Sequence, residues 1–377
     1  MLIKNASVYV NATRQFEKND IFISDGRIAA IGQLDAAEND VVIDVKGKPV
    51  VAGLVDVHTH GRAGHDFCCA DSEALHKMAR DYALHGVTTV MPTIASAPFE
   101  QMVDAARGVC DFVAGGGETE LCGVHLEGRY LNPKKKGAHA EHLISKPCAK
   151  ELDFFAKCKP LHISGAFEFD VDGSFSKKAL ELGATLGLGH TEATYAEARL
   201  CEQRGVSAYT HLFNAMPPLH HRDGGAVCAV LTGDCLAEII CDGIHVSPQM
   251  IRLAYSMLGA ERTVLISDSM EATGCPDGDG YSICGNAVTV KDGIARTEDG
   301  ALAGSTLTLD RAVNNLIDFC GIPLTEAILC ATENPAREIG VFDRVGSVDV
   351  GKTADLLFLR DENRLDIDKV MVRGTFI

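Results

Sequence analysis

The sequence predicts an α/β fold, a (β/α)8 barrel with a small β domain built from both chain ends. Between residues 50 and 268, short apolar runs alternate with amphipathic stretches, which is the pattern of buried parallel strands and covering helices. Both ends of the chain instead show short β runs separated by turn signals. The length of 377 residues accommodates a barrel of about 250 residues with additions.

The two chain ends have matching β character. Asp25-Gly26 lies between apolar runs, which is a strong hairpin signal, and residues 355–377 repeat the pattern of apolar run and turn. Residues 1–10 read as an edge strand. The predicted division of the chain is a small domain of residues 1–49 and 338–377 and a barrel domain of residues 50–337.

Eight strands are expected in the barrel. They are residues 50–58, 87–94, 121–127, 161–167, 184–189, 206–211, 236–242 and 263–268. Helices are expected between them, for example over 72–85 and over 247–258, where Gly259 marks the end. A β-hairpin insertion is expected near 276–300, with Asp292-Gly293 at a turn.

Composition limits the partners. The formal charge of −17 argues against nucleic acid or an anionic membrane as the main partner. No apolar run approaches the ~18 residues that span a bilayer, and no signal peptide is visible. The fourteen cysteines are scattered and form no CxxC pair, so reduced thiols are expected. These features favour a cytoplasmic protein.

Polar residues at the ends of the predicted strands point to a metal site. The active site of an α/β barrel lies at the carboxyl ends of its strands. Six residues of metal-ligand or acid/base type end these strands: His58, His60, Glu127, His190, His211 and Asp268.

His58 and His60 first indicate a bound ion. Residues two apart on a strand point to the same face, so the two imidazoles can share one ion. A single histidine at a strand end is more often a hydrogen-bonded core residue than a ligand, but six such residues at one barrel mouth make chance a poor explanation. Imidazole and carboxylate without clustered thiolates suit Zn, Fe or Mn.

A metal at this mouth predicts hydrolysis. A bound divalent ion lowers the pKa of its water to about 7 and polarises a carbonyl, so that hydroxide attacks. A carboxylate must then carry the proton to the leaving amine, and Asp268 is placed for that role. The alternative is that Asp268 caps a helix or pairs with a cation.

Several segments resemble the N-acetylglucosamine-6-phosphate deacetylases of the amidohydrolase superfamily. The resemblance covers essentially the whole chain in order. The segments that carry it are His125-Leu126-Glu127-Gly128, Lys135-Lys136-Gly137-Ala138-His139, Thr210-His211-Leu212-Phe213-Asn214-Ala215-Met216-Pro217, Asp242-Gly243-Ile244-His245-Val246, Ser267-Asp268-Ser269-Met270, Leu302-Ala303-Gly304-Ser305 and Gly351-Lys352-Thr353-Ala354-Asp355-Leu356.

The resemblance implies a TIM barrel with a small β-sandwich formed by both termini. It implies metal-dependent hydrolysis of the acetamide of N-acetyl-D-glucosamine 6-phosphate to D-glucosamine 6-phosphate and acetate. The implied ligands of the principal metal are Glu127, His190 and His211, with Asp268 as the general base and acid. His58 and His60 become a second metal position, so the implied cofactor is one or two divalent ions per subunit.

Substrate contacts are also implied by the resemblance. His139 and His245 correspond to sugar or carbonyl contacts, and Asn214, Ala215 and Arg222 correspond to phosphate-binding elements. The arginine at the matching position can serve the neighbouring subunit, which implies a homodimer. It also supplies a local cation on an acidic chain.

Two departures from the family pattern stand out. Arg129 occupies a position that is usually proline, and Arg222-Asp223-Gly224-Gly225 replaces Arg-Glu-Pro-Gly. Loss of proline frees a loop, and Arg129 reads equally as a solvated rim residue or a substrate contact. Cys68 and Cys69 follow the histidine pair and are expected to fill a small buried apolar space.

Three other functions stay open. The same chemistry would serve N-acetylgalactosamine 6-phosphate or another N-acyl compound. A cyclic-amide hydrolase shares the histidine pair but not the other segments. A non-catalytic scaffold is disfavoured because all six candidate residues are present.

Overall fold

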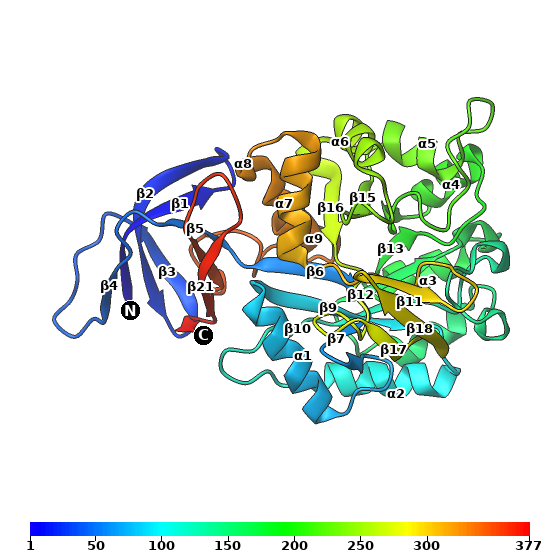
Figure 1. The fold of residues 1–377 in the computed structure, drawn as a ribbon, viewed down its shortest axis with the longest axis horizontal. Helices are drawn as coiled ribbons and strands as arrows, with labels where there is room; N and C mark the ends of the chain where they lie inside the picture. The colour runs from blue at the N-terminus through cyan, green and yellow to red at the C-terminus, as the bar shows by residue number, and fades with distance from the viewer.

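The computed structural model describes residues 1–377 and shows a barrel domain beside a smaller β domain (Figure 1). The barrel strands run parallel in the order β6-β9-β11-β12-β13-β14-β15-β16. This confirms the predicted fold class. The strands are β6 (Leu54–Thr59), β9 (Val87–Ala95), β11 (Val124–Glu127), β12 (Leu161–Gly165), β13 (Thr185–Leu188), β14 (Val206–Tyr209), β15 (Leu236–Ile240) and β16 (Thr263–Ile266). A short β10 (Glu120–Leu121) pairs with β9 ahead of β11.

Helices cover the outside of the barrel (Figure 1). They are α1 (Ser72–Leu84), α2 (Phe99–Cys110), α3 (Ser174–Glu181), α4 (Tyr195–Gln203), α5 (Gly225–Thr232), α6 (Pro248–Arg262), α7 (Leu309–Cys320), α8 (Leu324–Ala327) and α9 (Glu333–Glu338). Short 3-10 helices occupy Pro133–Lys135, Glu141–Leu143, Ala149–Phe155, Phe167–Phe169 and Leu329–Ala331. None of the helices combines the length and the hydropathy that crossing a bilayer requires.

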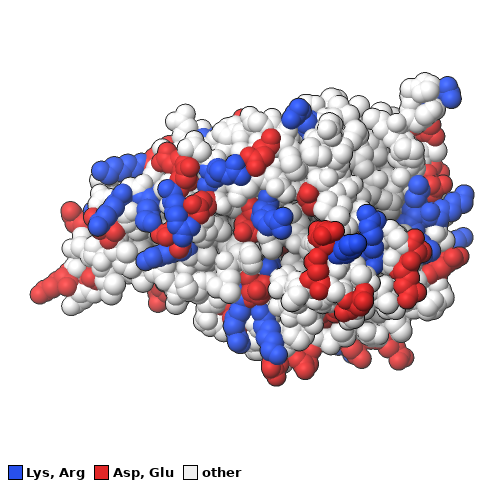
Figure 2. All heavy atoms as spheres, in the orientation of Figure 1, with Lys and Arg blue, Asp and Glu red and all other residues white.

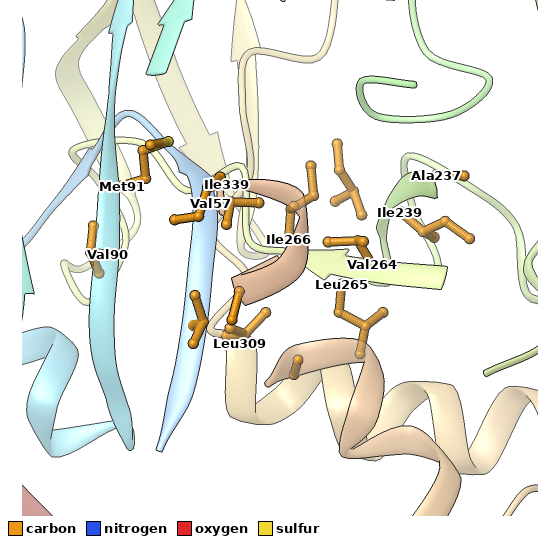
Figure 3. Packing of buried hydrophobic residues seen from close by; sticks show 14 of the residues in the cluster. Val57, Val90, Met91, Ala237, Ile239, Val264, Leu265, Ile266, Leu309 and Ile339 are labelled. Atoms are coloured by element: carbon orange, nitrogen blue, oxygen red, sulfur yellow. The ribbon is translucent and has the colours of Figure 1, made fainter. Parts of the chain in front are cut away.

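The barrel closes between β16 and β6, which form no regular ladder. The backbone N–H of Asp268 donates to the carbonyl of His58 at 2.9 Å, and that of Ser267 donates to the Asp56 carboxylate at 3.3 Å. We call this junction the seam. Buried side chains from β6, β9, β15 and β16 pack beside it with Leu309 and Ile339 (Figure 3).

Two predicted boundaries differ from the structure. Residues 49–52 form β5 (Pro49–Ala52) of the small domain, because they pair with β1 and β20 there. The predicted strand 121–127 is interrupted at Gly123, whose φ is +70° and whose Cα lies close to the Pro160 carbonyl. The predicted helix end at Gly259 is confirmed, because Gly259 is non-helical with φ of 68° and ψ of −175°; α6 includes a further turn beyond this kink, as far as Arg262.

The small β domain joins both termini in one sheet of order β22-β21-β20-β5-β1-β2-β3, with β4 on β1. β1 is therefore central and not an edge strand, because β5 and β2 pair on its two sides. Fourteen buried residues form a core of its own. The domain boundaries at 49 and 338 stay predictions. The strands are β1 (Leu2–Val10), β2 (Gln15–Ser24), β3 (Arg27–Gly32), β4 (Val42–Asp44), β20 (Leu356–Leu359), β21 (Ile367–Val372) and β22 (Thr375–Phe376).

The insertion after β16 has three strands, one more than the predicted hairpin. β17 (Gly278–Ile283), β18 (Asn286–Lys291) and β19 (Ile294–Thr297) are antiparallel. Asp292 and Gly293 turn the chain with φ of 54° and 71°, as a two-residue hairpin turn requires. The predicted hairpin therefore corresponds to β18 and β19, and the additional strand is β17, which pairs with β18. A smaller hairpin joins β7 (Gly61–Arg62) to β8 (His65–Asp66).

Candidate metal centre and substrate cavity

The barrel brings the six strand-end residues together in one buried cluster. Each of the six is at most 7% exposed. His190, His211 and Asp268 have left-handed backbones, with φ of 47°, 31° and 47°. These turns direct the three side chains back over the barrel mouth after their strands have ended.

Glu127, His190 and His211 form a compact triangle of donor atoms. Glu127 Oε1 lies 3.1 Å from His190 Nε2 and 2.9 Å from His211 Nε2, and the two nitrogens are 3.0 Å apart. An ion with bonds of about 2.0–2.2 Å needs tetrahedral ligand atoms roughly 3.3 Å apart. The triangle therefore matches three ligands of one ion after a small expansion.

His58, His60 and Asp268 form a second group of donors. His60 Nε2 lies 3.2 Å from Asp268 Oδ1 and 3.1 Å from Glu127 Oε2. His58 Nε2 lies 3.4 Å from the same Glu127 oxygen. Glu127 thus offers one oxygen to each group.

The chemistry of the donors fits divalent cations. Nε2 of His58 is buried and has no hydrogen-bond partner. Burial disfavours a charged imidazole, yet hydrogen bonds to Asp268 and Glu127 raise the pKa of His60 to about 9. The carboxylates of Asp268 and Glu127 therefore favour a positive charge between them and His60. A divalent ion supplies that charge without protonating its ligands.

A cavity of about 350 Å³ opens over these groups. His139, Asn214, Ala215 and His245 line it, as do His60 and Asp268. The Asp242 carboxylate accepts from Nδ1 of His245 at 2.7 Å and fixes that ring. His139 Nδ1 lies 2.9 Å from Ser96 Oγ, and burial lowers the pKa of His139 to about 3, so its imidazole is neutral.

Two cationic residues of the cavity lining were not among the predicted site residues. Lys134 and Lys135 line the cavity and follow Asn132, which caps the short helix that carries them. Their signal was the basic run in the segment that ends at His139. Lys135 pairs with Glu192 at 3.2 Å, whereas Lys134 forms no ion pair and adds a cation to the lining within a single chain.

Arg222 lies outside the lining of this cavity. It is exposed, and its guanidinium lies 2.8 Å from Nε2 of His221. Within one chain it therefore makes no contact with the site. Its assignment to the active site of a neighbouring subunit stays a prediction.

Arg129 is neither a solvated rim residue nor a lining residue of the cavity. Its guanidinium forms a two-pronged bond to Glu151, at 2.9 and 2.7 Å, and lies 4.9 Å from the centre of the Phe99 ring. Its backbone is left-handed, with φ of 65°. Arg129 therefore anchors the segment that carries His139.

The cysteines are all free thiols, as the sequence predicts. The Cys68 sulfur accepts from the Ala95 N–H at 3.2 Å beside the site, whereas Cys69 is exposed. The expected buried role is therefore wrong for Cys69, because the turn after β8 points it outward. On the face shown in Figure 2, basic and acidic groups are interspersed, without a broad basic surface.

Comparisons with known proteins define the class. A model of the amidohydrolase family matches residues 50–377. The chain therefore belongs to the amidohydrolase family, a family of metal-dependent enzymes.

The relatives narrow this to the sugar-phosphate deacetylases. An N-acetylglucosamine-6-phosphate deacetylase of Vibrio furnissii is 33% identical over 97% of this chain and 92% of its own. An N-acetylgalactosamine-6-phosphate deacetylase of Escherichia coli O157:H7 is 33% identical over 95% of this chain and 94% of its own.

Solved structures of the same enzyme class have the same fold. The N-acetylglucosamine-6-phosphate deacetylase of Thermotoga maritima has a TM-score of 0.88 and 32% identity, and covers 100% of this chain and 99% of its own. A substituted form of the Mycobacterium smegmatis enzyme, solved in complex with N-acetyl-D-glucosamine-6-phosphate, has a TM-score of 0.89 at 30% identity over 100% of this chain and 98% of its own.

Proposed function

We propose that this enzyme hydrolyses the acetamide of N-acetyl-D-glucosamine 6-phosphate to D-glucosamine 6-phosphate and acetate. One observation carries the proposal. Two buried donor groups share Glu127 at the floor of a cavity that Asp268 also lines. An amide bound in this cavity would therefore meet both the metal ligands and a proton carrier.

The ligands follow from the two groups. Glu127, His190 and His211 would hold the principal ion, and His58 and His60 would hold a second. Such an ion lowers the pKa of a bound water to about 7 and polarises a carbonyl oxygen. Histidine and carboxylate ligands favour Zn, Fe or Mn as the cofactor.

Asp268 moves the proton. Burial alone would raise the pKa of its carboxyl, but His60 and His58 hold that pKa below its ordinary range. Asp268 is therefore ionised at neutral pH and accepts the proton of the attacking water. It then delivers this proton to the amine nitrogen as the C–N bond breaks, because an amide anion is too basic to leave.

The sugar phosphate would extend from the metal centre along the cavity. His139 Nε2 lies 3.7 Å from Glu127 Oε2, and Asn214, Ala215 and His245 line the same cavity. Lys134 adds a cation that suits a phosphate. We further propose a homodimer in which Arg222 reaches the neighbouring site, and a cytoplasmic location in keeping with the free thiols.

A second substrate is supported by one observation. The N-acetylgalactosamine-6-phosphate deacetylase of Escherichia coli O157:H7 is as similar to the chain as the N-acetylglucosamine-6-phosphate deacetylase of Vibrio furnissii, at 33% identity each. The two sugars differ only in the orientation of one hydroxyl group, which is not part of the acetamide that is hydrolysed. The galactosamine epimer is therefore the second candidate.

Acetate release tests both candidates. The purified enzyme is assayed with each N-acetylhexosamine 6-phosphate and with unphosphorylated N-acetylglucosamine. We expect the highest kcat/KM with N-acetylglucosamine 6-phosphate and a loss of at least about tenfold without phosphate, the effect of one charged contact. Equal rates with and without phosphate would contradict the phosphate assignment, and no release from either sugar phosphate would contradict the function.

A further inference from the structure

A buried carboxylate lies one layer below the proposed metal centre. Glu238 is on β15 and is 0% exposed. It precedes the cavity residue Ile240 by two positions, so both side chains point into the barrel. Glu238 is separated from the cavity and cannot touch a substrate there.

One oxygen of this carboxylate contacts two candidate ligand residues. Glu238 Oε2 lies 2.9 Å from His58 Nδ1 and accepts the backbone N–H of His211 at 3.1 Å. The first bond fixes the proton on Nδ1 of His58, which leaves Nε2 as a lone-pair donor facing Glu127. The second bond fixes the left-handed turn that directs His211 over the barrel mouth.

Two buried polar side chains lie below the carboxylate, whose other oxygen, Oε1, has no hydrogen-bond partner. His162 and Glu338 lie close to it, with the ligand-type atoms of all three within 4.8 Å of one another. Both neighbours are fully enclosed at the side chain, and no lysine or arginine pairs with Glu238. Because no lysine or arginine side chain competes for the Glu238 carboxylate, its interaction with the His58 ring is not weakened by a second charged partner.

We infer that Glu238 is a positioning residue that sets the affinity of the second metal position by orienting His58. This inference rests on the proposed function, because it concerns the same centre. Partners that hold the second nitrogen of a ligating histidine fix the orientation of its ring and raise its basicity. Their removal weakens metal binding by about 10–100-fold in known sites.

Glu238→Gln tests the inference with a residue of nearly the same shape. Apo protein is titrated with Co²⁺, and visible absorbance follows the uptake of each ion, while elemental analysis counts ions per chain. The wild type should take up two ions. Glu238→Gln should bind the second about 10–100-fold more weakly and keep the affinity of the first.

Glu338→Gln is the matched control. It removes a buried carboxylate of the same cluster that makes no contact with His58 and should leave both affinities unchanged. If Glu338→Gln weakened binding of the second ion as much as Glu238→Gln does, the specific role of Glu238 would be overturned. An unchanged second affinity in Glu238→Gln, or a wild type that binds a single ion, would overturn it as well.

Binding of the first ion distinguishes a folding defect from altered positioning, because a misfolded chain loses both ions. Should Glu238→Gln fail to fold, Glu238→Asp keeps the charge but shortens the reach to His58. It should weaken the second ion while the first is retained, and an unchanged second affinity would overturn the inference. Acetate release by the wild type is measured separately, so a failed proposed function is recognised independently.

Discussion

His190, His211 and Asp268 combine a left-handed backbone with a buried polar side chain, at φ of 47°, 31° and 47°. Such a conformation costs about 1–3 kcal/mol per residue and persists only where its surroundings enforce it. The Asp268 amide is held by the His58 carbonyl, and Asp268 accepts the Ser305 N–H at its own carbonyl. The surrounding structure therefore enforces an unfavourable backbone conformation that directs these three side chains into the site.

Asp268→Asn should keep this geometry while removing the proton carrier. We expect kcat to fall by about 10²–10⁴-fold, the contribution of general acid–base catalysis. The chain should stay folded and retain the ion held by Glu127, His190 and His211. Steady-state acetate release with elemental analysis checks both points, and activity within twofold of the wild type removes Asp268 from its role.

Lys134→Ala tests the newly recognised cation. Loss of one charged contact to phosphate should lower kcat/KM for the phosphorylated sugar by about tenfold, roughly 1.4 kcal/mol. The unphosphorylated sugar should be used as before. Lys146→Ala, outside the cavity lining, serves as the control. Equal losses with both sugars would show that Lys134 supports the loop and not the phosphate.

At the scale of single residues, site residues could be predicted from their position directly after apolar runs. This is why all six strand-end residues could be predicted from the sequence. Glu238 could not be predicted as a site residue, because it lies within such an apolar run, Leu236–Ile240, where a charged residue has no periodic signal. Arg129 could not be assigned either, since its partner Glu151 is twenty-two residues away.

At the scale of elements, the three-stranded insertion forms one wall of the cavity through Ile283 and Cys284. Asn286 Nδ2 donates to the Ala138 carbonyl at 2.6 Å and ties the β17–β18 turn to the segment that carries His139. The sequence predicted the insertion from its turn signals. The contact with Ala138 could not be predicted, because it depends on how two long loops meet.

Asn286→Ala should loosen this wall. A lost hydrogen bond of about 1 kcal/mol corresponds to roughly a fivefold rise in KM, with little change in thermal stability. Thr289→Ala, which removes a bond to Asp279 inside the insertion, is the control and should leave KM unchanged. Steady-state kinetics with a melting curve checks the pair, and a matching KM rise in both variants would speak against a specific tie to Ala138.

At the scale of the whole molecule, Asp355 lies where the small β domain meets the barrel. Its carbonyl accepts the N–H of Gly53, between β5 and β6, and its carboxylate accepts the N–H of Arg373 at 2.7 Å. Burial raises the pKa of Asp355 from 3.8 to about 7. The folded chain therefore holds a proton at Asp355 that the unfolded chain releases near pH 4.

Stability from Asp355 is present at pH 4 and is lost as pH rises to about 7, because the unfolded state binds fewer protons in that interval. Asp355→Asn keeps the acceptor for Arg373 without the charge. It should be about as stable as the wild type at pH 4 and more stable by about 1–3 kcal/mol at pH 8. Urea unfolding at both pH values checks this, with exposed Asp35→Asn as the control. A difference that does not grow with pH would contradict the buried titration.

The seam between β16 and β6 contains an amide whose hydrogen exchange reports local opening of the barrel. The amide of Asp268 donates to the His58 carbonyl across this seam, so one of the bonds at the closure belongs to a candidate catalytic residue and a candidate ligand. This amide can exchange its hydrogen with solvent only when the seam opens. The deuterium exchange rate of this single amide would therefore report how often the barrel opens locally at the seam and exposes the metal centre.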